Sequence, residues 1–320
     1  MKTSLSVIFL FVFFIELYSQ NEPEPPAGYC GDFTLKLSYF LGLIDFIEKM
    51  PPVPESLREH NDIIYKEIDS TKLKLDIYHL MDLNELRPAI VFIHGGTWKS
   101  GDKKDYRKYL VDFALKGYVT VTIQYRLAGV AKFPAAVNDV KCAVKWIKEN
   151  GNKYFIDTNN IAVVGGSAGG HLAMMIGYSQ DAEIFNECSI NNVNTKVNAI
   201  VNLYGPCDLT TEYGRNHPGV INFLGKKYED EPEIFRAASP LFFITKDDTP
   251  TLIFQGTIDD VVPVSQSDTL KNALDRIGVY AEYHRLEGWP HTMDLEENVN
   301  KYCEFYMEKF FKRFIPFSKN

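Results

Sequence analysis

Apolar runs alternate with stretches of helical periodicity along most of the chain. Two segments of alternating pattern, 63–69 and 73–79, are typical of paired antiparallel strands. Continuous apolar runs predict strands buried on both faces, at 89–93, 119–125, 161–164, 197–203 and 251–255. Apolar positions at helical spacing predict helices at 106–116, 135–150, 168–178 and 299–314. This alternation indicates an α/β domain with a mostly parallel central sheet and helices on both faces.

The first 59 residues depart from this alternation. Residues 1–19 combine Lys2 with a short apolar run and then turn polar, as in a secretory signal peptide. The run is shorter than the roughly 20 apolar residues of a membrane span, so we expect an exported protein, secreted or periplasmic, without a stable membrane span. Residues 20–59 hold a proline-rich linker and an amphipathic helix over 33–50. We expect that helix to pack on the body of the protein; the alternative is that it lies over the mouth of the site.

Charge and cysteine content narrow the possible partners. A formal charge of −8, with no block of Lys and Arg, argues against nucleic acid. The five cysteines form neither a C-x-x-C motif nor a metal-ligand cluster, and we expect no metal and no cofactor. In an oxidising compartment one or two disulfides can form, Cys188 with Cys207 being one pairing to test. Buried thiols that behave as small apolar side chains are the alternative.

Ser167 lies in a G-x-S-x-G motif, Gly165-Gly-Ser-Ala-Gly169, between a predicted buried strand and a predicted helix. In this context the motif predicts a nucleophile elbow, a sharp turn that exposes the serine hydroxyl at a helix N-terminus. Small residues at positions 165 and 169 let the strand and helix approach closely. The alternative is a small-residue turn that happens to contain serine, but the flanking elements favour the nucleophile.

A glycine-containing loop, His94-Gly-Gly-Thr-Trp98, follows the predicted strand at 89–93. Backbone amides of such a loop can stabilise the oxyanion of an acyl-transfer reaction, and the amide of Ala168, next after Ser167, is the expected second donor. We assign the oxyanion hole to Gly95, Gly96 and Ala168. The division of this role between the amides of Gly95, Gly96 and Thr97 stays open. Trp98 is a candidate pocket residue, and His94 a structural one.

A serine nucleophile needs a histidine base held by a carboxylate, in the chain order Ser, Asp or Glu, His. His291 lies in a Gly/Pro loop after a predicted strand, which favours it over His217 and His284. Asp259, in the loop after the strand at 251–255, is the favoured carboxylate. Its competitors are Asp260, beside it, and Asp208 after the preceding strand.

With these motifs in place, residues 60–315 resemble the esterase/lipase branch of the α/β-hydrolases, from hormone-sensitive-lipase-like esterases to bacterial feruloyl-esterase-like and kynurenine-formamidase-like proteins. The resemblance is to the H-G-G-x-W group and implies an α/β-hydrolase catalytic domain over 60–320, with Asp259 completing the triad. It rests on these motifs: His94-Gly-Gly-Thr-Trp98, Gln124-Tyr-Arg-Leu127, Phe133-Pro-Ala-Ala136, Gly165-Gly-Ser-Ala-Gly-Gly170, Tyr204-Gly-Pro-Cys-Asp208, Gly256-Thr-Ile-Asp259 and His291.

These observations favour a serine carboxylic-ester hydrolase that works through an acyl-enzyme. Export and resemblance together suggest short acyl esters or acetyl and feruloyl esters linked to polysaccharides, with a small-molecule or carbohydrate-linked ester as the substrate. An amidase, such as a kynurenine-formamidase-like enzyme, is the alternative within enzymes. A catalytically inactive binding module is a third possibility. The presence of a residue at all three triad positions argues against it.

Overall fold

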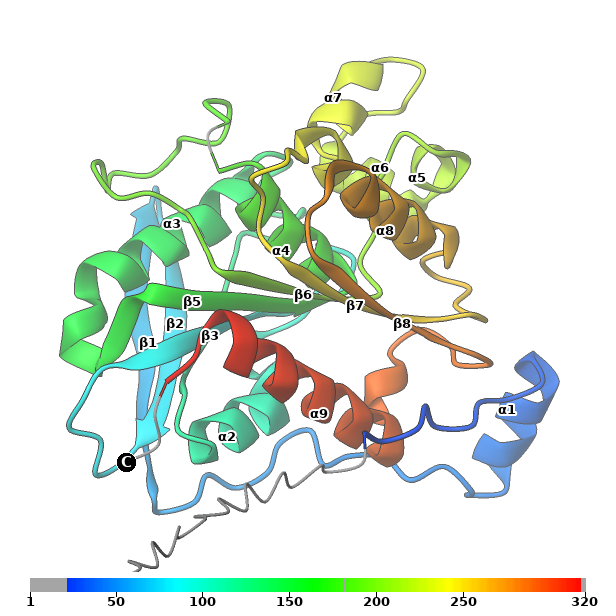
Figure 1. Ribbon diagram of the computed structural model, residues 1–320. Helices are drawn as coiled ribbons and strands as arrows, with labels where there is room; N and C mark the ends of the chain where they lie inside the picture. Colours follow the sequence, from blue (N-terminus) through cyan, green and yellow to red (C-terminus); the bar gives the residue numbers. More distant parts are fainter. Residues whose placement is uncertain (1–21, 181, 318–320) are drawn as a thin grey trace, which may run out of the picture.

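The computed structural model describes residues 22–180 and 182–317, and its centre is an eight-stranded sheet in the order β1-β2-β4-β3-β5-β6-β7-β8 (Figure 1). β1 and β2 pair antiparallel, as do β2 and β4, and the other neighbouring strands are parallel. The predicted signal peptide lies outside the described residues. The strands are β1 (Leu57–Ile68), β2 (Thr71–Leu80), β3 (Arg87–Ile93), β4 (Val119–Ile123), β5 (Ile156–Gly166), β6 (Ala199–Leu203), β7 (Thr251–Gly256) and β8 (Ala281–Leu286).

Helices cover both faces of this sheet, which confirms the predicted α/β-hydrolase architecture. On one face lie α3 (Ala135–Asn150), α4 (Ala168–Tyr178) and α8 (Ser265–Ile277), and on the other α2 (Arg107–Leu115) and α9 (Glu297–Phe314) (Figure 1). None of the helices in the described part of the chain is both long and apolar enough to cross a membrane. The shorter elements are α1 (Asp32–Phe40), α5 (Glu212–Asn216), α6 (Pro218–Leu224), α7 (Pro232–Ala237) and the 3₁₀ helices η1 (Lys103–Tyr106), η2 (Gly151–Tyr154), η3 (Pro240–Phe243) and η4 (Met293–Leu295).

The central strands are buried on both faces, which explains their continuous apolar sequences. In β3, Ala89, Val91 and Ile93 belong to the core beneath α3 and α4, whereas Ile90 and Phe92 belong to the core beneath α2 and α9. All five side chains are fully buried, and burial of each large one contributes about 1.5–3 kcal/mol. The sheet is therefore a rigid support, and the loops at the carboxyl ends of its parallel strands meet at one edge, where ligands bind in such folds.

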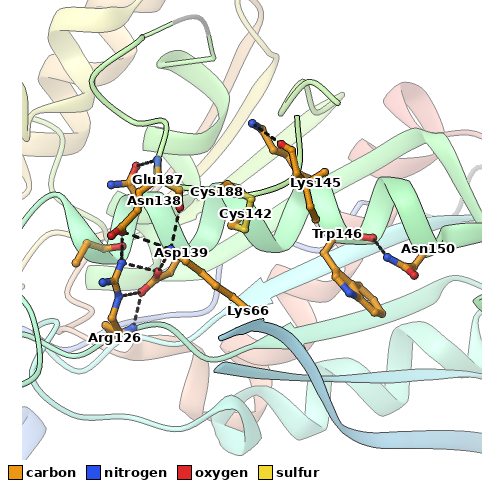
Figure 2. The surroundings of a disulfide bond; sticks show 12 residues. Lys66, Arg126, Asn138, Asp139, Cys142, Lys145, Trp146, Asn150, Glu187 and Cys188 are labelled. Atoms are coloured by element: carbon orange, nitrogen blue, oxygen red, sulfur yellow. Dashed lines mark hydrogen bonds and ion pairs between the residues drawn. A yellow bond between two sulfur atoms is a disulfide. The ribbon is translucent and has the colours of Figure 1, made fainter. Parts of the chain in front are cut away.

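A disulfide joins Cys142 on α3 to Cys188, in the loop between α4 and β6 (Figure 2). The pairing of Cys188 with Cys207 considered from the sequence is therefore wrong. Cys207 follows β6 and packs against α8 as a buried free thiol, which donates a hydrogen bond to a carbonyl of that helix at 3.1 Å. Cys30 and Cys303 are also free.

A buried ionic cluster lies beside the disulfide (Figure 2). The carboxylate of Asp139 accepts hydrogen bonds of 2.8 Å from two guanidinium nitrogens of Arg126 and one of 2.8 Å from Lys66. Glu187, next to Cys188, contacts both cations. The loop after α4 is thus held on α3 by a covalent bond and by charge, and loss of one buried partner in such a cluster costs about 3–5 kcal/mol.

Candidate active site

Ser167 stands at the turn between β5 and α4, with φ 55° and ψ −123°. This left-handed conformation is costly for a residue with a side chain, on the order of 1–3 kcal/mol, and the packing around it maintains it. A Cβ atom on Gly165 would lie 2.2 Å from the carbonyl oxygen of Gly169. The amide of Ser167 donates to the carbonyl of Leu203 at 2.8 Å. The turn therefore has the geometry predicted for a nucleophile elbow.

His291 lies between Ser167 and Asp259. Its Nδ1 is 2.7 Å from Oδ2 of Asp259, and its Nε2 is 3.1 Å from Oγ of Ser167. An ionised carboxylate can only accept, so Nδ1 carries the proton of the neutral imidazole and Nε2 accepts from the serine hydroxyl. The structure thus brings together the three residues predicted as nucleophile, base and carboxylate.

The Asp259 side chain is fully buried and accepts hydrogen bonds from several groups. Its Oδ1 accepts from the amides of Val261 and Val262 at 2.9 and 2.8 Å. Its Oδ2 accepts from Nε2 of Gln255 at 2.9 Å, in addition to the imidazole. These hydrogen bonds fix the orientation of the carboxylate toward His291.

The other residues weighed for the triad have different positions. Asp260 is exposed, and Oδ1 of Asp208 accepts from the amide and hydroxyl of Thr210, as a loop cap does. His284 is a β8 residue that contacts Tyr302 and Glu282. His217 caps the N-terminus of α6 through Nδ1, and burial together with the charge of His291 lowers its pKa.

Gly95 and Gly96 face Ser167 across a cavity of about 340 Å³. A Cβ atom on Gly95 would lie 2.8 Å from the carbonyl oxygen of Gly166, so the loop could not approach the elbow this closely with a side chain there. Gly96 has φ +96°, and a Cβ atom on it would lie 2.3 Å from the carbonyl oxygen of Ser100. Ala168 is the first residue of α4, and the first amides of a helix have no partner within it. Gly95 and Gly96 thus line the cavity of Ser167, and the oxyanion role of these amides and of the Ala168 amide stays a prediction.

Trp98 does not line this cavity, so its prediction as a pocket residue is wrong. Thr97 and Trp98 both have positive φ, and this turn directs the indole into the core. There it stacks on Phe223 at 4.5 Å and donates from Nε1 to Nδ1 of His171 at 3.2 Å. His94 is buried and stacked on a tyrosine of the neighbouring β4–α3 loop, consistent with a structural role.

The family model BD-FAE matches residues 75–274, well over half of the chain. The chain belongs to the BD-FAE family. The matched range includes Ser167 and Asp259 and ends before His291, which the structure places beside both.

Known proteins of similar sequence are named as esterases. Esterase LipC of Mycobacterium tuberculosis (strain ATCC 25618 / H37Rv) is 30% identical over 260 residues, 78% of this chain and 64% of LipC. The probable carboxylic ester hydrolase LipM of the same strain is 31% identical over 246 residues, 73% of this chain and 56% of LipM. The chain thus spans less than two thirds of the length of these relatives.

Solved structures share the fold over most of this BD-FAE chain. A truncated carbohydrate esterase from gut microbiota has a TM-score of 0.73 and 26% identity, covering 82% of this chain and 98% of that one. Est2, an esterase of Thermogutta terrifontis solved with propionate bound, has a TM-score of 0.71 and 27% identity, covering 86% of this chain and 100% of that one.

The N-terminal segment precedes the range matched by the BD-FAE model and forms part of the site. Helix α1 ends at Phe40, earlier than the helix predicted over 33–50, and Gly42 follows it in a left-handed conformation. The chain then runs along η4: the amide of Ile47 donates to the carbonyl of Leu295 at 3.0 Å. Ile47 and Lys49 line the cavity of Ser167. The segment therefore lies at the mouth of the site, which was the alternative to the favoured placement on the body of the protein.

A second cavity of about 300 Å³ adjoins the first and shares His291, Thr292 and Leu295 with it. Side chains of α1 and of the residues after it, Leu35, Tyr39, Ile44 and Phe46 among them, form its outer wall. On the outside of this wall Phe33 and Phe40 are 77% and 85% exposed. This N-terminal wall thus presents apolar side chains both to the second cavity and to its outer surface.

Several residues of the cavity of Ser167 were not predicted from the sequence, among them Tyr106, Tyr109, Tyr204 and Asp294. Tyr204 directly follows the carboxyl end of β6. Residues of the site in this BD-FAE domain come from such strand ends, so its position in the sequence could have identified Tyr204 as a site residue. Asp294 lies three positions after His291, but nothing in the sequence indicates that its side chain is buried. No group of three or more potential metal ligands occurs in the described ranges 22–180 and 182–317.

Proposed function

We propose that this protein hydrolyses carboxylic esters through an acyl-enzyme formed on Ser167. The observation that carries the proposal is the position of His291, within hydrogen-bond distance of both Ser167 and Asp259. A hydroxyl becomes a useful nucleophile only when a base can take its proton, and the base works best when a carboxylate holds its tautomer. The names of the BD-FAE relatives, esterases and carboxylic ester hydrolases, support the same reaction.

In the first half of the reaction, Oγ of Ser167 attacks the ester carbonyl while Nε2 of His291 takes its proton. The carbonyl oxygen becomes an oxyanion that accepts from the amides of Gly96 and Ala168, and Asp259 stabilises the imidazolium. Collapse of the tetrahedral intermediate breaks the bond to the alcohol oxygen, which receives the proton from His291. In the second half, water attacks the acyl carbonyl while His291 takes its proton. Collapse of this intermediate breaks the bond between the acyl carbon and Oγ of Ser167, which receives the proton from His291 as the free acid leaves.

We propose short acyl esters, including acyl groups carried on sugars, as the substrates. A cavity of about 340 Å³, lined mostly by polar side chains and glycines, suits a small acyl group. Est2 of Thermogutta terrifontis has been solved with propionate and with butyrate. Another structural relative, from Bacteroides eggerthii, is described as a bifunctional GH43-CE protein, and the gut-microbiota relative as a carbohydrate esterase.

We propose that the protein acts outside the cytoplasm. The expected signal peptide is one reason, and the Cys142–Cys188 disulfide is a second, because such bonds form and persist in oxidising compartments. Secretion of a reporter fused after residues 1–19, with a Lys2→Glu variant and a reporter without the segment as comparisons, tests this. Retention of all three fusions in the cytoplasm would contradict it.

The proposed activity is tested with p-nitrophenyl acetate, butyrate and octanoate, an acetylated xylan and a matched anilide. We expect turnover of the acetyl and butyryl esters, and loss of activity by about 10⁶-fold in Ser167→Ala. Labelling by a fluorophosphonate probe should also disappear in that variant, whereas Ser265→Ala, at the start of α8, should label as wild type. Turnover of the anilide alone would indicate an amidase, and absence of both turnover and labelling would overturn the proposal.

A further inference from the structure

Asp294 is a buried carboxylate on the wall of the catalytic cavity, with 2% of its surface exposed. Its Oδ1 accepts a hydrogen bond of 2.5 Å from the hydroxyl of Tyr204, and its Oδ2 one of 3.2 Å from Tyr109. Burial raises the pKa of this carboxyl above its usual range, and the hydrogen bonds from the two phenols and the charge of His291 offset only part of that effect. Asp294 thus lines the same cavity as the histidine of the triad, although Asp259 is the carboxylate that contacts that histidine.

Tyr204 connects Asp294 to His291. Its ring stands edge-on to the imidazole, with 4.7 Å between the ring centroids and 62° between the planes. Its backbone has φ +44°, a left-handed conformation that a tyrosine seldom adopts. The preceding residue, Leu203, accepts the hydrogen bond from the amide of Ser167. The same tyrosine thus borders the histidine on one side and the elbow on the other.

Gly166 allows the phenols to reach the elbow. A Cβ atom on Gly166 would lie 2.3 Å from the hydroxyl oxygen of Tyr106 and 3.0 Å from that of Tyr204. Any larger residue before Ser167 would push these hydroxyls away. The contact shows that the elbow, the tyrosines and Asp294 pack as one unit.

We propose that Asp294 is a positioning residue for the catalytic base: through Tyr204 it holds the His291 ring in line with Ser167 and Asp259, and its buried charge favours the imidazolium. This inference rests on the proposed function of the triad. The imidazole must keep two hydrogen bonds aligned while it gains and loses a proton, and Asp259 restrains it only at Nδ1. The edge of the Tyr204 ring restrains the imidazole plane, and Asp294 fixes the Tyr204 ring through its hydroxyl.

Other titratable groups surround this unit and contribute to the same field. They come from each element packed against it: Lys49 of the N-terminal segment, Asp105 and Tyr106 of η1, Lys108 and Tyr109 of α2, His217 just before α6, Asp259 after β7, and Cys303 and Glu304 of α9. The substitutions chosen below leave all of these in place except Tyr109, which serves as the comparison.

Two matched tyrosine variants separate positioning from packing. Tyr204→Phe and Tyr109→Phe each remove one hydroxyl donated to Asp294, but among the described rings only that of Tyr204 contacts His291. We expect Tyr204→Phe to lower kcat for p-nitrophenyl acetate about tenfold with little change in KM, and Tyr109→Phe to change kcat less than about threefold. Asp294→Asn should lower kcat at least as much as Tyr204→Phe, and the double variant Tyr204→Phe/Asp294→Asn no further, because the two act through one contact. Equal losses in both tyrosine variants, or additive losses in the double variant, would overturn the proposal.

The charge of Asp294 is tested by titration of His291, which needs no turnover. In the Ser167→Ala background, the pKa of the His291 imidazole is followed by NMR with and without Asp294→Asn. Removal of a neighbouring negative charge should lower that pKa by about half a unit or more, and in the active enzyme the acidic limb of kcat/KM should move to lower pH by the same amount. An unchanged imidazole pKa in a folded variant refutes the role of Asp294. Absence of wild-type turnover with the pKa shift intact would count against the esterase proposal alone.

Discussion

A Cβ atom on Gly169 would lie 2.0 Å from the carbonyl oxygen of Ile93, the last residue of β3. Helix α4 therefore rests directly on the end of the neighbouring strand, and this contact sets the height of Ser167 above the sheet. The second glycine of G-x-S-x-G is required by backbone packing against β3, and the first by packing against the helix.

Gly169→Ala should therefore destabilise the fold and displace the nucleophile. The clash is with backbone, which cannot rotate away, so we expect a loss of about 1–3 kcal/mol in the free energy of unfolding and a drop in kcat. Urea unfolding and p-nitrophenyl acetate kinetics measure the two effects. Gly129→Ala is the matched control, because a Cβ atom there meets no atom within 4 Å. Equal behaviour of the two variants would show that the contact with Ile93 is relaxed in solution.

Asp259→Asn and Asp260→Asn should differ greatly, although the residues are adjacent. Asp259 contacts Nδ1 of His291 and Asp260 is exposed. An asparagine at 259 can offer its amide to Nδ1 and so favours the wrong imidazole tautomer, which lowers kcat by about 10⁴-fold in such triads. We expect Asp260→Asn to remain within about twofold of wild type. A large loss at 260 with a small one at 259 would reverse the assignment.

The N-terminal wall should control the length of the acyl or alcohol group that the enzyme accepts. Ile47 lines the catalytic cavity and is fixed through its backbone to Leu295. Ile47→Trp fills part of the space, so the ratio of kcat/KM for octanoate to that for acetate should fall about tenfold or more, and Ile47→Ala should raise it. Ile64→Trp places the same side chain at an exposed position of β1 and should leave the ratio unchanged. If Ile64→Trp alters the ratio as much as Ile47→Trp does, the effect of Ile47→Trp does not come from filling the cavity.

The order of the triad and the alternation of strands and helices could be read from the sequence because both depend on local patterns. Two other features could not. The approach of Tyr204 and Asp294 to His291 depends on β6 and β8 lying on either side of β7, which is a property of the assembled sheet. The disulfide partner of Cys188 depends on the position of the long loop that carries it. Nothing in the sequence indicates that this loop packs against α3.

Some predicted helix and strand boundaries also differ from the structure, for physical reasons. β1 starts at Leu57, earlier than predicted, because the polar residues at its start pair with β2 through their backbones. α8 was not expected at all, since few of its positions are buried and its apolar face is narrow. The helix predicted over 33–50 ends at Phe40 because the following residues run alongside η4 and bridge to Glu296 through Phe46.

Glu304 on α9 should make stability depend on pH. Burial and the neighbouring Asp112 raise the pKa of Glu304 to about 7, from about 4.3 in an unfolded chain. Between these values the folded state binds more protons than the unfolded state, so stability falls as pH rises from about 4.3 to 7.

Glu304→Gln should remove this dependence. The free energy of unfolding of the variant relative to wild type should increase by about 1–3 kcal/mol between pH 5 and pH 8, measured by urea unfolding. The exposed Glu297 lies on the same helix, and Glu297→Gln should show no such increase. If the free energies of unfolding of Glu304→Gln and wild type differ by the same amount at pH 5 and pH 8, Glu304 is ionised throughout this pH range.

The Cys142–Cys188 bond also has a topological consequence. The chain between the two cysteines contains β5, Ser167 and α4, so the nucleophile sits on a closed covalent ring. Ile184, in the same ring, is 53% exposed on the loop after α4. A single protease cut at that loop opens the ring without releasing a fragment, and the nicked protein should migrate as one species until a reductant is added, when it separates into two chains with Ser167 on the N-terminal piece.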